Sequence, residues 1–242
     1  MNKQLPRKYT CRYITDDLPV DGSLTHSAWS KAEWTDDFED IEGSSKPIPS
    51  FKTRAKLLWS DKYLYIGAFL EEPHVWATIT KKNSVIFHDN DFEVFIDPDG
   101  DSMNYHEFEM NALNTIWELT LVKPYRDGGP VIDPDNIEGL KTAVRVSGTI
   151  NDSSDTDEGW SLEIAIPWAG LVKYAGTMKC PPSPGDTWRM NFSRVEWKIE
   201  IVNGEYVKKP GKEDNWVWSP QGMIDMHQPE HWGYVRFDRS KR

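Results

Sequence analysis

The sequence predicts an all-β fold, namely a jelly-roll-like antiparallel β-sandwich with long loops and one or two short helices. Runs of five to ten residues rich in β-branched and aromatic side chains recur along the chain. Turn-forming stretches such as DPDGD, NDSSDTDEG and PPSPGD separate these runs. Helical periodicity is confined to two short segments. Short strands spaced by such turns are typical of sandwiches and barrels.

We expect strands, in chain order, at 55–59, 63–70, 92–96, 106–113, 115–122, 142–150, 160–166, 188–197 and 233–237. The first helical segment is 26–34, where Ser23 or Thr25 would act as the N-cap. The second is 167–175, which starts with proline, a residue suited to the first turn of a helix. Neither segment is long enough to build a helical layer.

The chain of 242 residues contains no internal repeat, and its Pro and Gly residues are spread too evenly to mark a linker. Sandwiches of this length commonly form one unit. We therefore expect a single domain over residues 1–242. Cys11 and Cys180 are too few for a disulfide framework, and whether they pair stays open.

The composition excludes several classes of partner. The formal net charge is -11 and the basic residues are dispersed, so neither nucleic acid nor an anionic membrane surface is expected to bind. No apolar run approaches the roughly 20 residues that span a bilayer, so no membrane insertion is expected. The N-terminal segment has basic residues without an apolar stretch, and we expect no signal peptide in this chain. Localisation stays open.

The segment DNDFEVFIDPDGD, residues 89–101, contains the most informative strand. Because side chains alternate along a strand, Phe92, Val94 and Ile96 point one way and Glu93 points the other. If this strand pairs with 106–113 through their apolar faces, the opposite face of the hairpin is polar. The polar face then carries Glu93, Glu107, Glu109 and Asn111.

This polar face has three interpretations. It meets solvent, binds a ligand, or supports catalysis. Phe95 and Leu113 share it, and a mixture of apolar and polar side chains is typical of ligand-binding surfaces. Glycoside hydrolysis requires two carboxylates at a defined separation, for which Glu93 and Glu109 are the candidates.

Metal and cofactor sites are less well specified. Asp97, Asp99 and Asp101 alternate in one turn and offer the oxygen ligands that Ca²⁺ takes, although the turn is not an EF-hand. No zinc, nucleotide-binding or serine-hydrolase motif occurs. A haem would need a pair of axial ligands such as Met103 or Met110 with His227.

Tryptophan is unusually frequent, with 12 residues, and its ring can stack on the C–H face of a sugar. Trp216 and Trp218 lie in NWVWSP, which we expect to be a loop that exposes at least one of them. Arg194 could donate charge-assisted hydrogen bonds to a ligand. Its parity with Phe192 would instead place it in the core or on the other face.

Seven segments in order resemble the family 9 carbohydrate-binding modules and their DOMON-like relatives, over nearly the whole chain. They are DGSLTHSAW (21–29), AKLLWSDKYLYIGAFLEEP (55–73), DNDFEVFIDPDGD (89–101), EFEMNALNT (107–115), GWSLEIAIPW (159–168), GDTWRMNFSRVEW (185–197) and WSPQG to HQPEHWGYVRF (218–237).

The resemblance implies a non-catalytic domain that binds an oligo- or polysaccharide outside the cytoplasm, near or within glycan-degrading enzymes of bacteria, with structural calcium. It also implies that a glutamate and amides take the hydroxyls of a terminal sugar. These positions fall on Glu93, Asn111 and Asn191. The alternatives are a haem-binding electron-transfer domain, known from DOMON-like relatives, and a glycoside hydrolase.

In sugar-binding members two tryptophans hold the sugar between them. In this sequence the first position is nearest to Phe87, and the second falls near Met226 and His227. The resemblance therefore predicts ligand contacts from these three residues. A replacement indole would come from Trp117, Trp197, Trp216 or Trp218.

Overall fold

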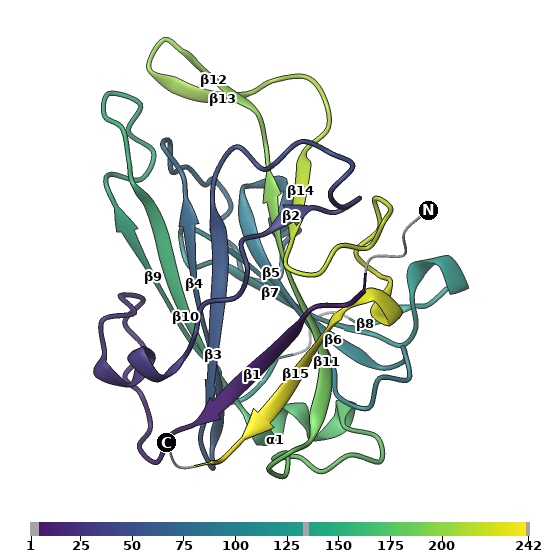
Figure 1. Cartoon of the computed structure of the whole chain (residues 1–242). Helices are drawn as coiled ribbons and strands as arrows, with labels where there is room; N and C mark the ends of the chain where they lie inside the picture. The colour runs from purple at the N-terminus through teal and green to yellow at the C-terminus, as the bar shows by residue number, and fades with distance from the viewer. Residues whose placement is uncertain (1–4, 133–135, 241–242) are drawn as a thin grey trace.

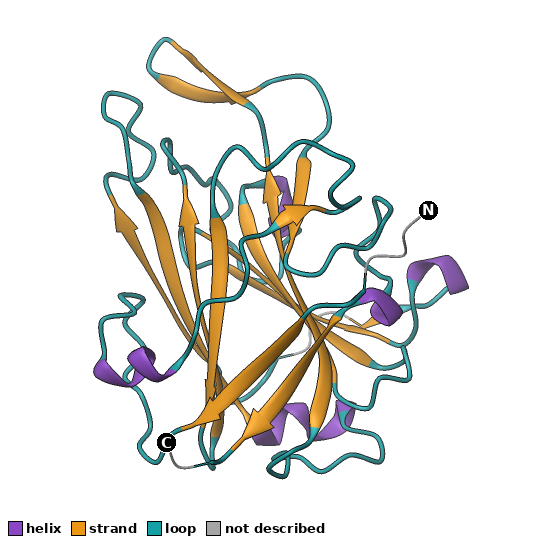
Figure 2. Cartoon of the chain, in the orientation of Figure 1, coloured by secondary structure: helices purple, strands orange, loops and turns teal. Residues whose placement is uncertain are grey.

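The computed structural model describes residues 5–132 and 136–240, and strands dominate it (Figure 2). The strands are β1 (Lys8–Tyr13), β2 (Glu39–Asp40), β3 (Thr53–Trp59), β4 (Tyr63–Glu71), β5 (Asp91–Asp97), β6 (Tyr105–Asn111), β7 (Ile116–Leu121), β8 (Val131–Ile132), β9 (Lys141–Ser147), β10 (Gly159–Pro167), β11 (Thr187–Glu196), β12 (Ile199–Val202), β13 (Glu205–Lys208), β14 (Asp214–Val217) and β15 (Gly233–Asp238). All nine predicted strands are present.

Two curled layers face each other (Figure 1). One contains β8, β7, β6, β5 and β11, and the other contains β3, β4, β10 and β9. Strands β15 and β1 connect the layers, so hydrogen bonding runs continuously from β11 through β15 and β1 to β3. Strand β1 pairs in parallel with both of its neighbours, whereas the other pairs are antiparallel. The predicted jelly-roll-like sandwich is confirmed.

The core lies between the layers and is built by alternation along the strands. Phe92, Val94 and Ile96 of β5 are fully buried in it, as predicted. They pack in one cluster with residues of the opposite layer such as Ile66 and Leu162. The other face of β5 and β6 therefore points away from this core.

The prediction that Trp216 and Trp218 lie in a loop that exposes at least one of them is wrong. Residues Asp214–Val217 form β14, which extends the layer by pairing with β11 and β2. Trp216 and Trp218 belong to the core cluster and are only 4% and 1% exposed. These two buried indoles therefore do not replace the sugar-stacking tryptophans that the resemblance predicts.

Helical structure is limited to single turns in the described residues. These are the 3-10 turns η1 (Ser27–Lys31), η2 (Ile86–His88), η3 (Tyr125–Asp127), η4 (Val172–Tyr174) and η5 (Pro229–His231), and the α-helical turn α1 (Trp168–Leu171). His26 caps η1, with its Nδ1 accepting from Ala28 N at 3.3 Å. The predicted cap at Ser23 or Thr25 is wrong, because these hydroxyls bond to each other at 2.7 Å.

The outer face of β4 and β10 is covered by the chain segment that follows β1. Trp29, Ile14 and Leu18 pack there in a second apolar cluster with Tyr65. Glu163 of β10 lies beneath this cover and accepts four hydrogen bonds, from the backbone of residues 21, 22 and 24 and from an indole. This carboxylate fixes the covering segment to the sheet.

Cys11 is buried, Cys180 is half-buried, and both are free thiols. None of the helical turns in residues 5–132 and 136–240 has the length and hydropathy that crossing a bilayer requires.

Candidate functional site

The outer face of β5, β6 and β11 gathers four carboxyl groups. In the register of β5 and β6, Glu93 lies opposite Glu109, and Glu107 lies opposite Phe95. Asp91 is the next residue of β5 on the same face. All four carboxyls are buried, and Glu93, the most accessible, is 5% exposed. The polar face predicted from the sequence therefore exists, but these four groups, here called the carboxyl cluster, are buried rather than open to solvent.

These carboxyls crowd one another. Oxygen atoms of Asp91, Glu93 and Glu109 lie within 4.8 Å of one another. Burial raises the pKa of Glu93 to about 7. Burial, followed by the charge of Glu93, also raises the pKa of Asp91, Glu107 and Glu109 well above the usual range. The group therefore stores electrostatic repulsion that a hydrogen-bond donor or a cation would relieve.

The hydrogen-bonding capacity of the group is only partly used. Glu109 accepts from the backbone N–H of Phe87 at 3.1 Å, and Asp91 accepts from that of Val195 at 3.1 Å. Oδ2 of Asp91 and Oε2 of Glu107 have no partner among the described residues. Buried polar atoms are normally bonded, so these two oxygens still have the capacity to accept a hydrogen bond.

The two predicted amides lie at this face but serve other groups. Asn111 donates to the Ile79 carbonyl and to Asp89, and its oxygen accepts from the backbone of Leu113 and Thr115. An amide side chain has two N–H groups and two acceptor positions, so Asn111 has no capacity left for a ligand. Its predicted contact with a sugar is wrong.

Asn191 is similarly occupied. Its amide donates to the Ser219 carbonyl and accepts from the Ser219 N–H, both at 2.9 Å. The side chain is fully buried. Asn191 therefore anchors the loop after β14, and a direct contact with a ligand stays a prediction.

Arg194 does not reach this face. It is fully buried on the core side of β11, where it pairs with Glu72 at 2.5 Å and Glu196 at 2.7 Å. It also donates to Thr53 and to the backbone of residue 71. The predicted ligand contact is wrong, because its parity with Phe192 places the two side chains on one face.

Phe87 lies beside the carboxyl cluster. It lies in η2, is 36% exposed and holds Glu109 through its backbone N–H. Its carbonyl accepts from Trp197 Nε1 at 2.8 Å, and the carbonyl of His88 accepts from Lys208. Lys208 belongs to the hairpin of β12 and β13, which projects beyond the two layers (Figure 1). The hairpin thereby helps to position Phe87.

Tyr125 and His227 also lie at this face. Their rings meet edge-on, with centroids 4.4 Å apart, and Tyr125 is 49% exposed. Burial raises the pKa of Tyr125 to about 12, and the charges of Glu107 and Glu109 contribute, which places the phenol near the carboxyls. Sequence reasoning missed Tyr125. The aromatic residue in the turn PYRDGG directly after a strand of the polar face was the available signal.

His227 is fixed by Tyr105, whose hydroxyl lies 2.8 Å from Nδ1. Burial lowers the pKa of His227 to about 4, so the imidazole is neutral at pH 7. Met226 packs against the apolar cluster around Phe95 and Trp232. The predicted residues Met226 and His227 thus lie at the polar face, and their contact with a ligand stays a prediction.

Trp117 of β7 lies opposite Glu109 and is half-buried. Its indole N–H has no partner among the described residues. Of the four indoles considered as replacements, Trp117 and Trp197 therefore lie next to the carboxyl cluster.

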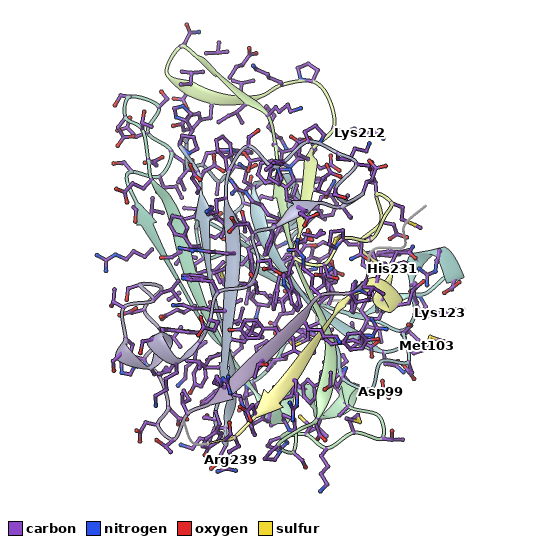
Figure 3. The ribbon with its side chains drawn as sticks, in the orientation of Figure 1. Asp99, Met103, Lys123, Lys212, His231 and Arg239 are labelled. Carbon is purple, nitrogen blue, oxygen red and sulfur yellow. The ribbon has the colours of Figure 1, made fainter. Side chains whose placement is uncertain are left out.

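The turn between β5 and β6 contains the predicted calcium ligands. Oxygen atoms of Asp97, Asp99 and Asp101 lie within 4.8 Å of one another. Asp97 already accepts backbone N–H bonds from Gly100 and Ser102, both at 3.0 Å. Figure 3 shows Asp99 at the periphery of the molecule. Calcium binding at this turn stays a prediction.

The alternative chemistries find little support. Met110 is buried in the core, on the opposite side of β6 from His227, so this pair cannot ligate one haem. Met103 is 42% exposed in the turn before β6. Glu93 and Glu109 stand side by side on one floor, whereas the carboxyls of a glycosidase flank the bond that they cleave.

Similarity to known proteins identifies the family. The model of the carbohydrate family 9 binding domain-like family matches residues 20–236. Curated relatives include exoglucanase XynX of Acetivibrio thermocellus, 28% identical over 124 residues, and endo-1,4-beta-xylanase A of Thermoanaerobacterium saccharolyticum, 25% identical over 123 residues. The matches cover 51% of this chain but only 10% and 9% of these relatives.

Solved structures share the fold over almost the whole chain. A family 9 carbohydrate-binding module from Caldicellulosiruptor kristjanssonii, in complex with cellotriose, has a TM-score of 0.61 at 16% identity, covering 97% of this chain and 95% of the module. A proposed carbohydrate-binding protein from Bacteroides uniformis has a TM-score of 0.67 at 17% identity, covering 96% of this chain and 99% of that protein. The chain therefore belongs to the carbohydrate family 9 binding domain-like family.

Proposed function

We propose that this domain binds a carbohydrate without cleaving it, at the carboxyl cluster on the outer face of β5, β6 and β11. The observation that carries the proposal is that buried carboxyl oxygens without hydrogen-bond donors lie near partly exposed aromatic rings. Glu107 and Asp91 supply the unpartnered oxygens. Phe87 and Tyr125 supply the rings.

A sugar matches both features. Its hydroxyl groups donate to carboxylates, and its C–H faces stack on aromatic rings. Glu93 is the most accessible carboxyl of the group and is the first candidate for accepting from a hydroxyl. The indole N–H of Trp117 would donate to a sugar oxygen. A neutral His227 beside Tyr125 adds no charge that would select an acidic sugar.

The relatives support a chain of glucose or xylose units as the ligand. One structural neighbour from Caldicellulosiruptor kristjanssonii was solved with cellotriose and again with glucose. Two curated relatives are named as an exoglucanase and a xylanase. We infer that the domain works beside glycan-degrading enzymes. Glu93 and Glu109 lie side by side on neighbouring strands, which favours binding over catalysis.

The test is a glycan array followed by calorimetric titration of the best ligand. We expect Glu93→Ala to weaken binding at least about tenfold, because a hydrogen bond to a charged group contributes about 1.5–3 kcal/mol. Glu33→Ala, at an exposed position between η1 and β2, is the matched control and should leave the affinity unchanged. Circular dichroism establishes that both variants fold. Unchanged affinity in the Glu93 variant would reject the site.

A further inference from the structure

The structure assigns a second binding surface, for an acidic sugar chain, to the outer face of the layer that contains β3, β4, β10 and β9. Its central residues are Trp34, Arg54, Phe69 and Arg145, here called the arginine surface. The carboxyl cluster belongs to the other layer, so the two sites are separate. The inference rests on the proposed function in one respect, namely that the ligand is a glycan.

Strand pairing gathers basic residues that are far apart in the sequence. Arg54 of β3 lies opposite Phe69 of β4, Phe69 lies opposite Ser161 of β10, and Ser161 lies opposite Arg145 of β9. A neighbour of each residue along its strand packs in or against the core cluster, so this row faces outward. The row crosses three gaps of about 4.8 Å between strands and is about 14 Å long. A chain of several sugar units is needed to reach both arginines.

The row is accessible to a ligand. Arg145 is exposed, and Arg54 and Phe69 are half-buried. The segment that follows β1 runs along one side of the row, where the Ser161 hydroxyl donates to the Gly22 carbonyl at 2.6 Å. Figure 1 shows this segment beside the lower part of β9 and β10. The covering segment therefore borders the arginine surface and leaves its side chains accessible.

Arg54 is held in place while its hydrogen-bonding capacity stays unused. Its guanidinium lies over the Trp34 ring, with Cζ 4.3 Å from the ring centroid. Its Nε is buried and has no hydrogen-bond partner within the described part of the chain. A stacked guanidinium loses less side-chain freedom when it binds, and its planar donors match the two oxygens of a carboxylate. Arg54 is therefore suited to bind a carboxylate.

Lys56, two residues further along the same face of β3, adds positive charge next to Arg54. Its Nζ lies 4.3 Å from the Trp34 ring centroid, so both cations contact one indole. Its hydrogen bond to the Trp29 carbonyl is long, at 3.5 Å. Burial lowers the pKa of Lys56 and the charge of Arg54 lowers it further, whereas Glu163 acts in the opposite direction. An anion bound at Arg54 would relieve the repulsion between the two cations.

Arg145 provides the second cation of the row. Hydrogen bonds from Ser23 lower the pKa of Asp21, and the charge of Arg145 contributes. The carboxylate of Asp21 accepts from the Ser23 N–H at 2.9 Å and forms no ion pair with Arg145. The guanidinium of Arg145 is therefore available to a second carboxylate of the same ligand.

The ligand chemistry follows from the aromatic ring between the two arginines. The half-buried ring of Phe69 lies directly beside Arg54 and offers a face on which a sugar ring can stack. A uronic acid combines such a ring with a carboxylate. The net charge of -11 repels large polyanions such as nucleic acid, whereas a short acidic sugar chain meets this charge only locally.

The test is a calorimetric titration with tetragalacturonate, a chain of four uronic acids. The same chain with its carboxylates reduced to alcohols is the control ligand. Acetylated and amidated tetraglutamate carries four carboxylates without sugar rings and represents an acidic protein segment. We expect tetragalacturonate to bind at least about tenfold more tightly than either of the other two ligands. Its affinity should fall as the salt concentration rises.

Three variants test the residues. Arg54→Gln should weaken tetragalacturonate binding at least about tenfold, and Arg54→Lys should recover only part of the loss because lysine lacks the planar fork. Arg145→Gln and Phe69→Ala should each weaken it about 2–10-fold. Lys179→Gln removes the same charge from an exposed position between η4 and β11 and should change nothing.

Circular dichroism establishes that each variant folds. Arg145 is exposed, so Arg145→Gln keeps the test valid if Arg54→Gln does not fold. The inference is overturned if the parent protein does not bind tetragalacturonate or binds tetraglutamate equally well. It is also overturned if the folded arginine variants keep the affinity of the parent.

The two sites are distinguished by crossing their variants and ligands. Glu93→Ala should leave tetragalacturonate binding unchanged, and Arg54→Gln should leave the binding of a neutral glycan unchanged. Tetragalacturonate binding without any binding of a neutral glycan would reject the carboxyl cluster as a sugar site alone. Neutral glycan binding that depends on Glu93, together with no binding of tetragalacturonate, would reject the arginine surface alone.

Discussion

Glu163 and Glu93 are two glutamates buried on the outer faces of the two layers, and their surroundings differ. Glu163 accepts four hydrogen bonds, two at each oxygen, from Asp21, Gly22, Leu24 and the indole of Trp29. Glu93 stands beside three other carboxyls, and burial raises its pKa to about 7. Glu163 is a structural anchor, whereas Glu93 is the proposed ligand contact.

The difference teaches that burial alone does not identify a binding residue. Both carboxylates are nearly inaccessible to solvent. What distinguishes them is whether the chain supplies donors. Backbone N–H groups of the segment after β1 converge on Glu163, and on the other layer the Phe87 N–H reaches Glu109. Counting donors therefore separates the anchor from the candidate site.

The largest expected effect comes from making the same substitution at both positions. Glu163→Gln should lower the free energy of unfolding by about 2–4 kcal/mol, because the new N–H₂ group faces N–H donors that then lose their acceptor. Glu93→Gln should raise it by about 1 kcal/mol at pH 8 without metal, because it removes a charge from a crowded buried group. Urea denaturation measures both values. Equal destabilisation of the two variants would contradict the distinction.

The pH dependence of stability is the second test. The pKa of Glu93 is about 7 in the folded protein against 4.5 for an ordinary glutamate, and the pKa of Asp97 is about 7 against 3.8. The folded state therefore holds more protons over this range, so these groups reduce stability as pH rises through 7. His227, with a pKa near 4 against 6.5, acts in the opposite direction between those values.

We therefore expect the metal-free protein to lose stability as pH rises from about 4.5 to about 7, most steeply between pH 6.5 and pH 7, where His227 no longer compensates. Urea midpoints at several pH values measure this loss. Glu93→Gln should flatten the profile, whereas a profile as steep as that of the parent would show that other groups dominate.

Removal of either partly exposed aromatic ring should have a smaller effect on sugar binding. Phe87→Ala and Tyr125→Ala should each weaken sugar binding about 2–10-fold, which corresponds to about 0.5–1.5 kcal/mol for a stacked ring. Both rings are partly exposed, so stability should change little. Ile48→Ala, at a position that is 91% exposed, is the control. Titration of the best glycan measures the affinities. Unchanged binding in both aromatic variants would show that Phe87 and Tyr125 are not part of the site.

The smallest effect is expected at the turn after β5. Asp99→Asn should change the metal-free stability by no more than about 0.5 kcal/mol, because Asp99 is partly exposed. If calcium binds at this turn, the same variant should lose part of the calcium-induced rise in melting temperature. An unchanged rise would place all calcium binding elsewhere.

The sequence predicted the sandwich, the nine strands and the sharing of one face by Glu93, Glu107 and Glu109, because alternation fixes which side chains point together. It could not predict that both N–H groups of Asn111 are already used, since their acceptors, Ile79 and Asp89, lie in another segment of the chain. The burial of Trp216 depends on a strand pairing of only four residues, which local patterns do not specify. Tyr125 lies in a turn, and the alternation of side chains along strands does not predict the path of a turn.

The hydrogen bonds that connect Phe87 and His88 to Trp197 and to Lys208 of the β12–β13 hairpin have an evolutionary consequence. The backbone next to Phe87 is held in part by an appendage outside the two layers, while the carboxyls belong to the central strands. Insertions, deletions or substitutions in the hairpin can therefore shift Phe87 while the carboxyl cluster stays unchanged. Such a division lets a lineage explore new ligand shapes at little risk to folding.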